Sequence, residues 1–230
     1  MNKYSSYTNA ELEEHLSNYL IDSWSYSKVA SFSRNEKEFE KREIYRERSR
    51  SSSSTVAGNA YHSALEYFFM ELQRKGQIIP ITEMERVAFS YIEEVHPNDG
   101  KIQKTTPTVE ECKIEATKNA TRLINNFYGE KDIYLSGIKE IIAVEIPLPC
   151  HARLDLAIRT ESGRTVIIDH KSRAKFTDDE ELTFTCGKQA MTYVKCYESR
   201  FGENVDEVWF VENKISKNKD GSSQLKKFVI

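Results

Sequence analysis

An Asp and a Lys two residues apart, at the end of an apolar predicted strand, are the residues of this sequence best suited to chemistry. The strand is predicted over 164–171 and ends in Val-Ile-Ile-Asp-His-Lys. Because side chains alternate along a strand, Asp169 and Lys171 share one face, and Ile168 and His170 take the other. A carboxylate in this place can hold a hard divalent cation, and the ammonium can orient or help deprotonate a water molecule beside it.

A second carboxylate lies on the preceding predicted strand, 151–159. Its aliphatic residues are expected on the core face: Leu154, Leu156 and Ile158. Asp155 then takes the opposite face, where it can converge with Asp169 across a hairpin. Glu145, one strand earlier, adds a third acidic side chain, although a solvent-facing Glu would be equally ordinary there. Together with Lys171, these residues predict a magnesium site for phosphodiester hydrolysis.

Each of these features is common by itself. An Asp two residues before a Lys on an exposed strand is most often a surface ion pair. A His on an aromatic-rich helix, here His62, is more often a core residue than a ligand, and Gln189 and Tyr193 are ordinary on an amphipathic helix. Only their joint occurrence, in one order along the chain, favours a catalytic site.

The elements that must position these residues change in character along the chain. Apolar residues at helical spacing predict helices over 8–20, 27–48, 56–75, 83–95, 108–128 and 186–200. Runs of β-branched residues predict strands over 138–148, 151–159, 164–171, 206–212 and 225–230. A polar stretch predicts a loop over 49–55. This order predicts a three-layer α/β core with a mostly helical N-terminal lobe.

Two helix ends and one apolar stripe are specified by particular residues. Gly76 is expected to end the helix over 56–75. Thr108 and Glu111 form a capping box at the start of the helix over 108–128. The apolar stripe of that helix is expected from five residues: Ile114, Ala120, Leu123, Ile124 and Phe127.

Composition limits the classes that remain. The chain has 230 residues, 33 basic against 36 acidic ones, and a net charge of −3, which excludes a globally basic nucleic-acid coat protein. No run approaches the roughly 18 apolar residues of a membrane span, and the N-terminus lacks a signal-peptide core. The four Cys, at 112, 150, 186 and 196, form no C-x-x-C pair. We therefore expect a protein of the reducing cytoplasm with no membrane partner.

The order of the short motifs resembles the PD-(D/E)XK phosphodiesterase superfamily, and specifically its RecB-like exonuclease branch. Ser25-Tyr26-Ser27 leads into a helix, and Gly58 and His62 form a Gly-x-x-x-His signature. Glu145 is followed by Ala152 and Asp155, and then by Asp169-His170-Lys171. A Gln-x-x-x-Tyr motif, Gln189 to Tyr193, completes the series. The resemblance spans about 25–213, nearly the whole chain.

The resemblance implies a role for each matching position. Asp155 and Asp169 would be central metal ligands, joined by the backbone carbonyl of His170, and His62 would complete the metal shell. Lys171 would position the attacking water and stabilise charge on the phosphate. Glu145 would be an auxiliary acidic residue. Gln189 and Tyr193 would contact DNA or brace Lys171. Apart from the resemblance, the basic residues predict that DNA is also bound by Arg153, Arg173 and Lys175.

The sequence departs from relatives of this branch in two respects. Ala152 stands where a Gly is usual before the Asp. Relatives with an iron–sulfur cluster place one Cys before the His helix and three near the C-terminus, whereas here no Cys precedes 112 or follows 196. We therefore expect no iron–sulfur cluster. A Walker A pattern is also missing, so any helicase activity belongs to a partner.

The resemblance thus implies a restriction-endonuclease-like fold. Residues 1–100 would form the helical lobe that contributes His62, and residues 101–230 the α/β nuclease core, as one integrated domain. The implied activity is a Mg²⁺- or Mn²⁺-dependent deoxyribonuclease with one or two ions. It would be an exonuclease of recombination, repair or phage DNA processing in a bacterial or phage-infected cell, with a helicase or recombination protein as a partner. A catalytically silent nucleic-acid-binding scaffold of the same fold is the main alternative. A hydrolase of another phosphodiester has no supporting feature.

Overall fold

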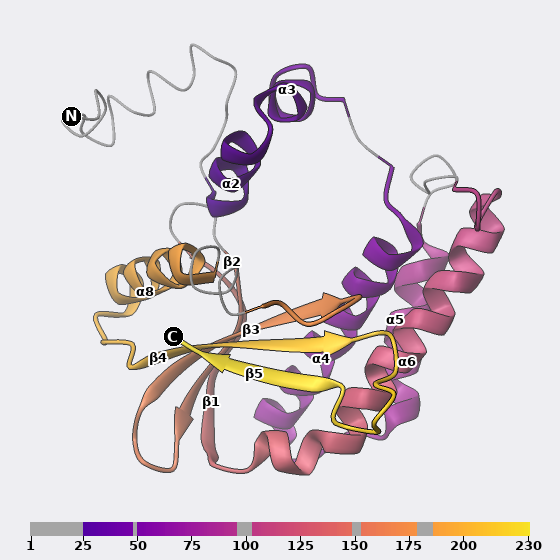
Figure 1. Ribbon diagram of the computed structural model, residues 1–230. Coiled ribbons are helices and arrows are strands. Elements are labelled where there is room, and N and C mark those ends of the chain that lie inside the picture. Colours follow the sequence, from indigo (N-terminus) through magenta and orange to yellow (C-terminus); the bar gives the residue numbers. More distant parts are fainter. Residues whose placement is uncertain (1–24, 48–49, 96–102, 149–152, 179–185) are drawn as a thin grey trace, which may run out of the picture.

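The structure of the protein is a computed structural model that describes residues 25–47, 50–95, 103–148, 153–178 and 186–230 (Figure 1). The helix expected over 8–20 and the position of Ala152 lie outside these segments. So does the expected boundary between lobe and core at residue 100, so this division stays a prediction.

A single mixed sheet forms the centre of the molecule. Its strands, in spatial order, are β1 (Ile138–Pro147), β2 (Arg153–Thr160), β3 (Thr165–Arg173), β4 (Glu207–Lys214) and β5 (Leu225–Val229). β1, β2 and β3 form an antiparallel meander, and β4 and β5 are antiparallel as well. β3 and β4 are parallel, and helix α8 (Gly187–Phe201) connects them. The predicted sequence of three strands, helix and strand is confirmed.

Helices cover both faces of this sheet. Helices α4 (Ser53–Lys75), α5 (Ile81–Glu93) and α6 (Val109–Leu135) pack together and share one apolar cluster with Val166 and Ile168 of β3. Ile167, between those two residues, packs in a second cluster with α8. Figure 1 shows α8 and the α4–α6 group on opposite sides of the strands. The expected three-layer core is therefore confirmed.

The predicted caps at the start of α6 and at the end of α4 are confirmed. Thr108 and Glu111 form the expected capping box of α6, and Gly76 ends α4 with a left-handed φ of 65°. The expected apolar stripe of α6 is wrong at Ile114, which is 48% exposed. Helix α6 also continues to Leu135, seven residues beyond the expected end. Because of this extension, Tyr134 in the last turn of α6 contacts His170 of β3.

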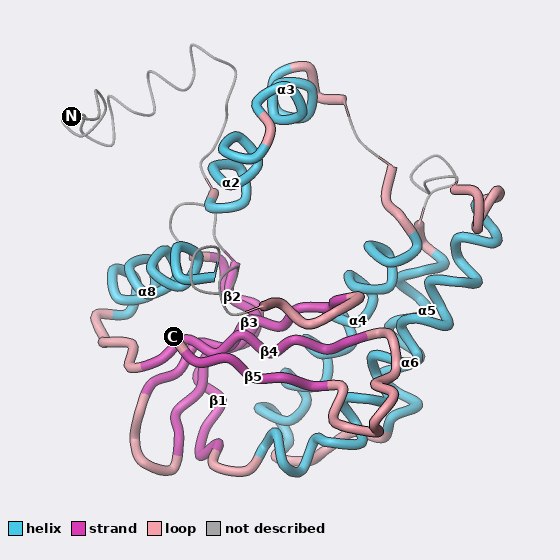
Figure 2. Tube along the Cα trace, in the orientation of Figure 1, coloured by secondary structure: helices cyan, strands magenta, loops and turns pink. Residues whose placement is uncertain are grey.

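The region before α4 is helical, as expected, but it is not one helix. It consists of α2 (Tyr26–Arg34), α3 (Glu36–Phe39) and the π-helix η1 (Glu40–Ile44). The break is at Asn35, whose backbone is extended and whose side chain accepts a hydrogen bond of 3.2 Å from the amide of Glu38. An Asn in this conformation caps a new helix instead of continuing the old one. In Figure 2, α2 and α3 stand away from the sheet.

The predicted loop over 49–55 is shorter than expected. Ser52 caps α4 by accepting a hydrogen bond from the amide of Thr55, so the helix already begins at Ser53. Among the described segments, no helix has the length and apolar character needed to cross a bilayer.

Candidate active site

Two facing residues of β1 and β2 interrupt the alternation of side chains. Val144 pairs with Leu156, and Ile146 pairs with Leu154, so Glu145 and Asp155 stand opposite each other. Leu156 packs with α4–α6, but Leu154 packs with α8. The expectation that Leu154, Leu156 and Ile158 share one core face is therefore wrong at Leu154.

The backbone of Glu145 explains this change of face. Glu145 has a φ of 48°, in the left-handed region that residues other than Gly rarely adopt. Such a residue rotates the strand on either side of it, much as a bulge does. Because strain of this kind persists only where surrounding structure enforces it, its place beside Asp155 marks the site as a specialised one.

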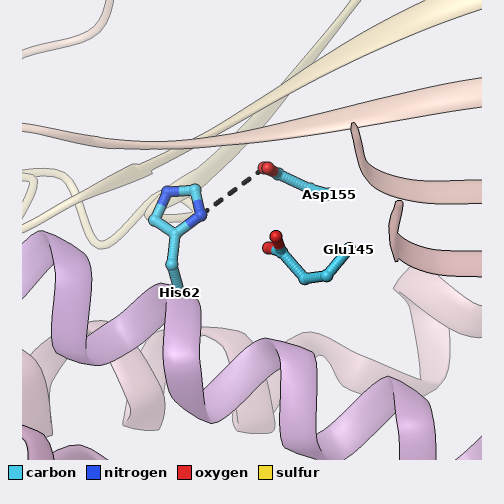
Figure 3. A group of neighbouring side chains, drawn as sticks. All are labelled: His62, Glu145 and Asp155. Atoms are coloured by element: carbon cyan, nitrogen blue, oxygen red, sulfur yellow. Dashed lines mark ion pairs between the residues drawn. The ribbon is translucent and has the colours of Figure 1, made fainter. Parts of the chain in front are cut away.

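His62, on α4, completes a group with these two carboxylates. Donor atoms of His62, Glu145 and Asp155 all lie within 4.8 Å of one another, and His62 Nδ1 is 3.5 Å from Asp155 Oδ2. Figure 3 shows the three side chains pointing toward one another, with His62 arriving from the helix and the carboxylates from the strands. The structure thus brings together three of the residues that the sequence singled out.

Gly58 allows α4 to lie close enough for this contact. A Cβ atom on Gly58 would be 2.5 Å from Ser172 Oγ on β3, much closer than any ordinary contact. His62 follows four residues later, on the same face of the helix. The absence of a side chain at Gly58 therefore sets the distance between the helix and the strands at the site.

The charges of this group suit a divalent cation. Burial lowers the pKa of His62, so its imidazole is neutral and has a free lone pair. Burial alone would raise the pKa of Asp155, but His170 and His62 outweigh it and the pKa is lowered. Burial, together with Asp155, raises the pKa of Glu145 to about 7. One neutral imidazole and two carboxylates fit a divalent cation, which would also hold Glu145 in its charged form.

Asp169 belongs to a second, neighbouring group. Its Oδ1 accepts hydrogen bonds from Tyr193 Oη at 2.8 Å and Gln189 Nε2 at 3.2 Å, both on α8. Its Oδ2 lies 2.8 Å from Lys171 Nζ. Asp169 and Lys171 share one face, as the alternation predicted, and Gln189 and Tyr193 contact Asp169 directly. Asp169 is not a member of the group formed by His62, Glu145 and Asp155.

Lys171 is a half-buried cation whose charge is stabilised by Asp169. Burial alone would lower the pKa of Lys171, but the Asp169 carboxylate outweighs it and the pKa is raised. Burial raises the pKa of Asp169, against the opposing effect of Lys171. Lys171 therefore stays protonated near neutral pH. In this state it can stabilise negative charge, but it cannot accept a proton from water.

The residues expected to contact nucleic acid differ in their surroundings. Arg153 Nε lies 2.6 Å from Glu145 Oε2, so Arg153 neutralises a candidate metal ligand. Arg173 Nε lies 3.1 Å from Glu212 Oε1, and Glu212 is fully buried on β4. Lys175 is exposed. Of these three cations, Arg153 and Lys175 are exposed, whereas Arg173 is half-buried.

Sequence reasoning missed the side chain of His170 and its partner Tyr134. The sequence assigned only the backbone carbonyl of His170 to the site. In the structure, His170 Nε2 lies 2.8 Å from Tyr134 Oη, and the His170 amide donates a 2.7 Å hydrogen bond to Asp155 Oδ2. Alternation did place His170 on the inner face, but nothing in the sequence showed that α6 would reach as far as Tyr134.

Comparison with known protein families shows the family to which this chain belongs. The profile of the PD-(D/E)XK nuclease superfamily matches residues 23–226. The chain belongs to the PD-(D/E)XK nuclease superfamily, and its fold is restriction-endonuclease-like. It is thus a nuclease by class, and members of this superfamily use divalent metals and act on DNA.

Solved structures and curated proteins add little to this assignment. The chain is similar to the crystal structure of a repair endonuclease from Pyrococcus abyssi, at 19% identity and a TM-score of 0.27. That match covers 40% of this chain and 37% of the other chain, well under two thirds of its length. No curated protein matches significantly.

Proposed function

We propose that the protein is a Mg²⁺- or Mn²⁺-dependent exodeoxyribonuclease of the RecB-like branch. It acts in recombination, repair or phage DNA processing in a bacterial or phage-infected cell, with strand separation supplied by a helicase or recombination partner. One observation carries the metal dependence: a neutral imidazole and two carboxylates meet beside the ion pair between buried Asp169 and half-buried Lys171. The exonuclease assignment rests on the motif order.

The metal would be held by His62, Glu145 and Asp155, with Asp169 and the His170 carbonyl as further ligands. A bound cation would supply Lewis-acid chemistry, neutralising charge on the phosphate and lowering the pKa of water. When no metal is bound, Arg153 is the ion-pair partner of Glu145. Its guanidinium would then be available to a phosphate once the metal neutralises Glu145.

Lys171 would stabilise the negative charge that develops on the phosphate during hydrolysis. Its ammonium is already charged and already positioned by Asp169, so it needs no reorganisation as the reaction proceeds. Tyr193 and Gln189 hold Asp169 Oδ1, which fixes the direction of the other oxygen, Oδ2. Arg173 and Lys175, which follow Lys171 along the chain, would bind phosphates next to the site.

A cleavage assay on two forms of single-stranded DNA tests the proposal. End-labelled linear DNA and covalently closed circular DNA are incubated with Mg²⁺, Mn²⁺ or EDTA. Three proteins are compared: wild type, Asp169→Ala and Asp132→Ala, the last changing an exposed acidic residue of α6. We expect metal-dependent loss of the linear DNA only, by wild type and Asp132→Ala but not by Asp169→Ala.

Each other result removes a defined part of the proposal. Cutting of the circle would make the protein an endonuclease. Cleavage in EDTA would remove the metal dependence, and cleavage by Asp169→Ala would remove the site assignment. Binding of DNA in EDTA, with no cleavage under any condition, would make the protein a silent scaffold.

A further inference from the structure

The side chain of His170 connects a helix to a candidate metal ligand. His170 is 2% exposed, and its ring stacks on Phe69 of α4 with ring centres 5.7 Å apart. Tyr134, in the last turn of α6, lies 2.8 Å from His170 Nε2 through its hydroxyl. Both nearest aromatic neighbours therefore come from the helices that cover this face of the sheet, and they fix the plane of the imidazole.

The other ring nitrogen faces Asp155. His170 Nδ1 lies 3.7 Å from Asp155 Oδ2, which is ion-pair range but beyond hydrogen-bond length. The backbone amide of His170 donates to the same Oδ2 at 2.7 Å. The residues of β2 that pair with β3 are Leu156 to Arg159, so Asp155 lies just outside this pairing. Here the Asp155 carboxylate, in place of a backbone carbonyl of β2, accepts the hydrogen bond from the His170 amide.

The proton of the imidazole can be placed from both of its neighbours. Burial raises the pKa of Tyr134 well above its usual range, so its hydroxyl keeps its proton and can donate it to Nε2. With Nε2 accepting from Tyr134, a hydrogen of His170 sits on Nδ1 and faces the Asp155 carboxylate. The opposite tautomer would direct a lone pair toward that carboxylate, which is electrostatically unfavourable.

We propose that the Tyr134 hydroxyl and the His170 imidazole act as a positioning pair, which holds the Asp155 carboxylate in the orientation that binds the metal. The inference deepens the proposed function and rests on it. Carboxylates that ligate metals are commonly oriented by partners outside the metal shell, whose loss lowers metal affinity about 10- to 100-fold. His170 thus acts through Asp155, in addition to the carbonyl role that the motif implies.

The alternative role for His170 is packing between Phe69 and the strands. Two substitutions separate positioning from packing. Asn places its amide where Nδ1 lies and can still donate to Asp155, whereas Gln places its amide where Nε2 lies and keeps only the Tyr134 contact. Both remove the ring, and both keep the backbone amide, so a packing role predicts the same effect for His170→Asn and His170→Gln.

The experiment is a titration of the DNA-free protein with Mn²⁺, followed by the electron paramagnetic resonance signal of the unbound ion. Four proteins are compared: wild type, His170→Asn, His170→Gln and Tyr134→Phe, with thermal unfolding measured in EDTA. We expect His170→Gln to raise the Kd for Mn²⁺ at least about tenfold, and His170→Asn to stay within about threefold of wild type. Tyr134→Phe should fall between them.

Each contrary result has one meaning. Equal Kd values for His170→Asn and His170→Gln, with equal losses of thermal stability, would show a packing role and overturn the inference. An unchanged Kd in Tyr134→Phe would overturn it even if neither His170 variant folds. A wild-type protein that binds no Mn²⁺ would instead refute the metal site of the proposed function, and the inference with it.

Discussion

Glu145 changes its charge within the physiological pH range. Burial beside Asp155 raises its pKa from 4.5 to about 7 in the folded protein without metal. A carboxyl group with a raised folded-state pKa stabilises the protein below its unfolded pKa and loses this contribution as pH rises through the folded value. In the metal-free protein, the stabilising contribution of Glu145 should therefore be lost between pH 4.5 and about 7.

The variant Glu145→Gln tests this at the level of one residue. Its amide cannot ionise, so the fall in melting temperature between pH 5 and 8 in EDTA should be smaller than in wild type. Mn²⁺ should restore the stability of wild type at pH 8, because the ion favours the charged carboxylate. The same pH dependence in both proteins would show that Glu145 does not carry it.

Single residues of the site were predictable as far as alternation holds. Asp169 and Lys171 share a face because β3 is regular through this segment. The grouping of Glu145 and Asp155 with His62 was not predictable from alternation, because the left-handed backbone of Glu145 changes the face of the strand. No sequence pattern predicts a positive φ at a non-glycine residue such as this one.

At the level of elements, the approach of α4 to β3 determines where His62 lies. A Cβ on Gly58 would meet Ser172 Oγ at 2.5 Å but Ser172 Cβ at 3.6 Å, an ordinary contact. Gly58→Ala should lower the free energy of unfolding by about 1 kcal/mol, because an overpacking cost of roughly 1–3 kcal/mol exceeds the roughly 1 kcal/mol by which Ala favours a helix. Urea denaturation measures this change.

The double variant Gly58→Ala/Ser172→Ala is the matched control. It removes the clashing hydroxyl and keeps the better helix former, so it should be at least as stable as wild type. If Gly58→Ala alone were as stable as the double variant, close approach would not be the reason for this glycine.

Most elements could be predicted because their signals are local. Caps at Thr108 and Gly76, together with runs of β-branched residues, placed the helices and strands of the core within a few residues, apart from the end of α6. The break at Asn35 was missed because the charged residues around it have helical spacing on both sides. The extension of α6 to Leu135 depends on packing against the sheet, which local patterns do not contain.

Because the net charge of the whole molecule is −3, attraction of DNA depends on local groups of cations. Binding to DNA through a few cations next to Lys171 should weaken steeply with salt, as counterions are released. Lys175→Ala should lower the slope of log K against log salt by about 1, measured in EDTA by fluorescence anisotropy. Lys195→Ala, which removes an 82% exposed lysine on α8, should leave the slope unchanged. Equal slopes in all three proteins would exclude Lys175 from the DNA path.

The most direct test of the proposed catalytic site is the single-turnover cleavage rate of Lys171→Ala on linear DNA with saturating Mn²⁺. Loss of the ammonium should reduce the rate about 10²–10³-fold, since the charge acts on the transition state and not on the bound DNA. Lys118→Ala, an exposed lysine of α6 paired with Glu115, should cleave like wild type. Cleavage by folded Lys171→Ala at the wild-type rate would contradict the catalytic site described here.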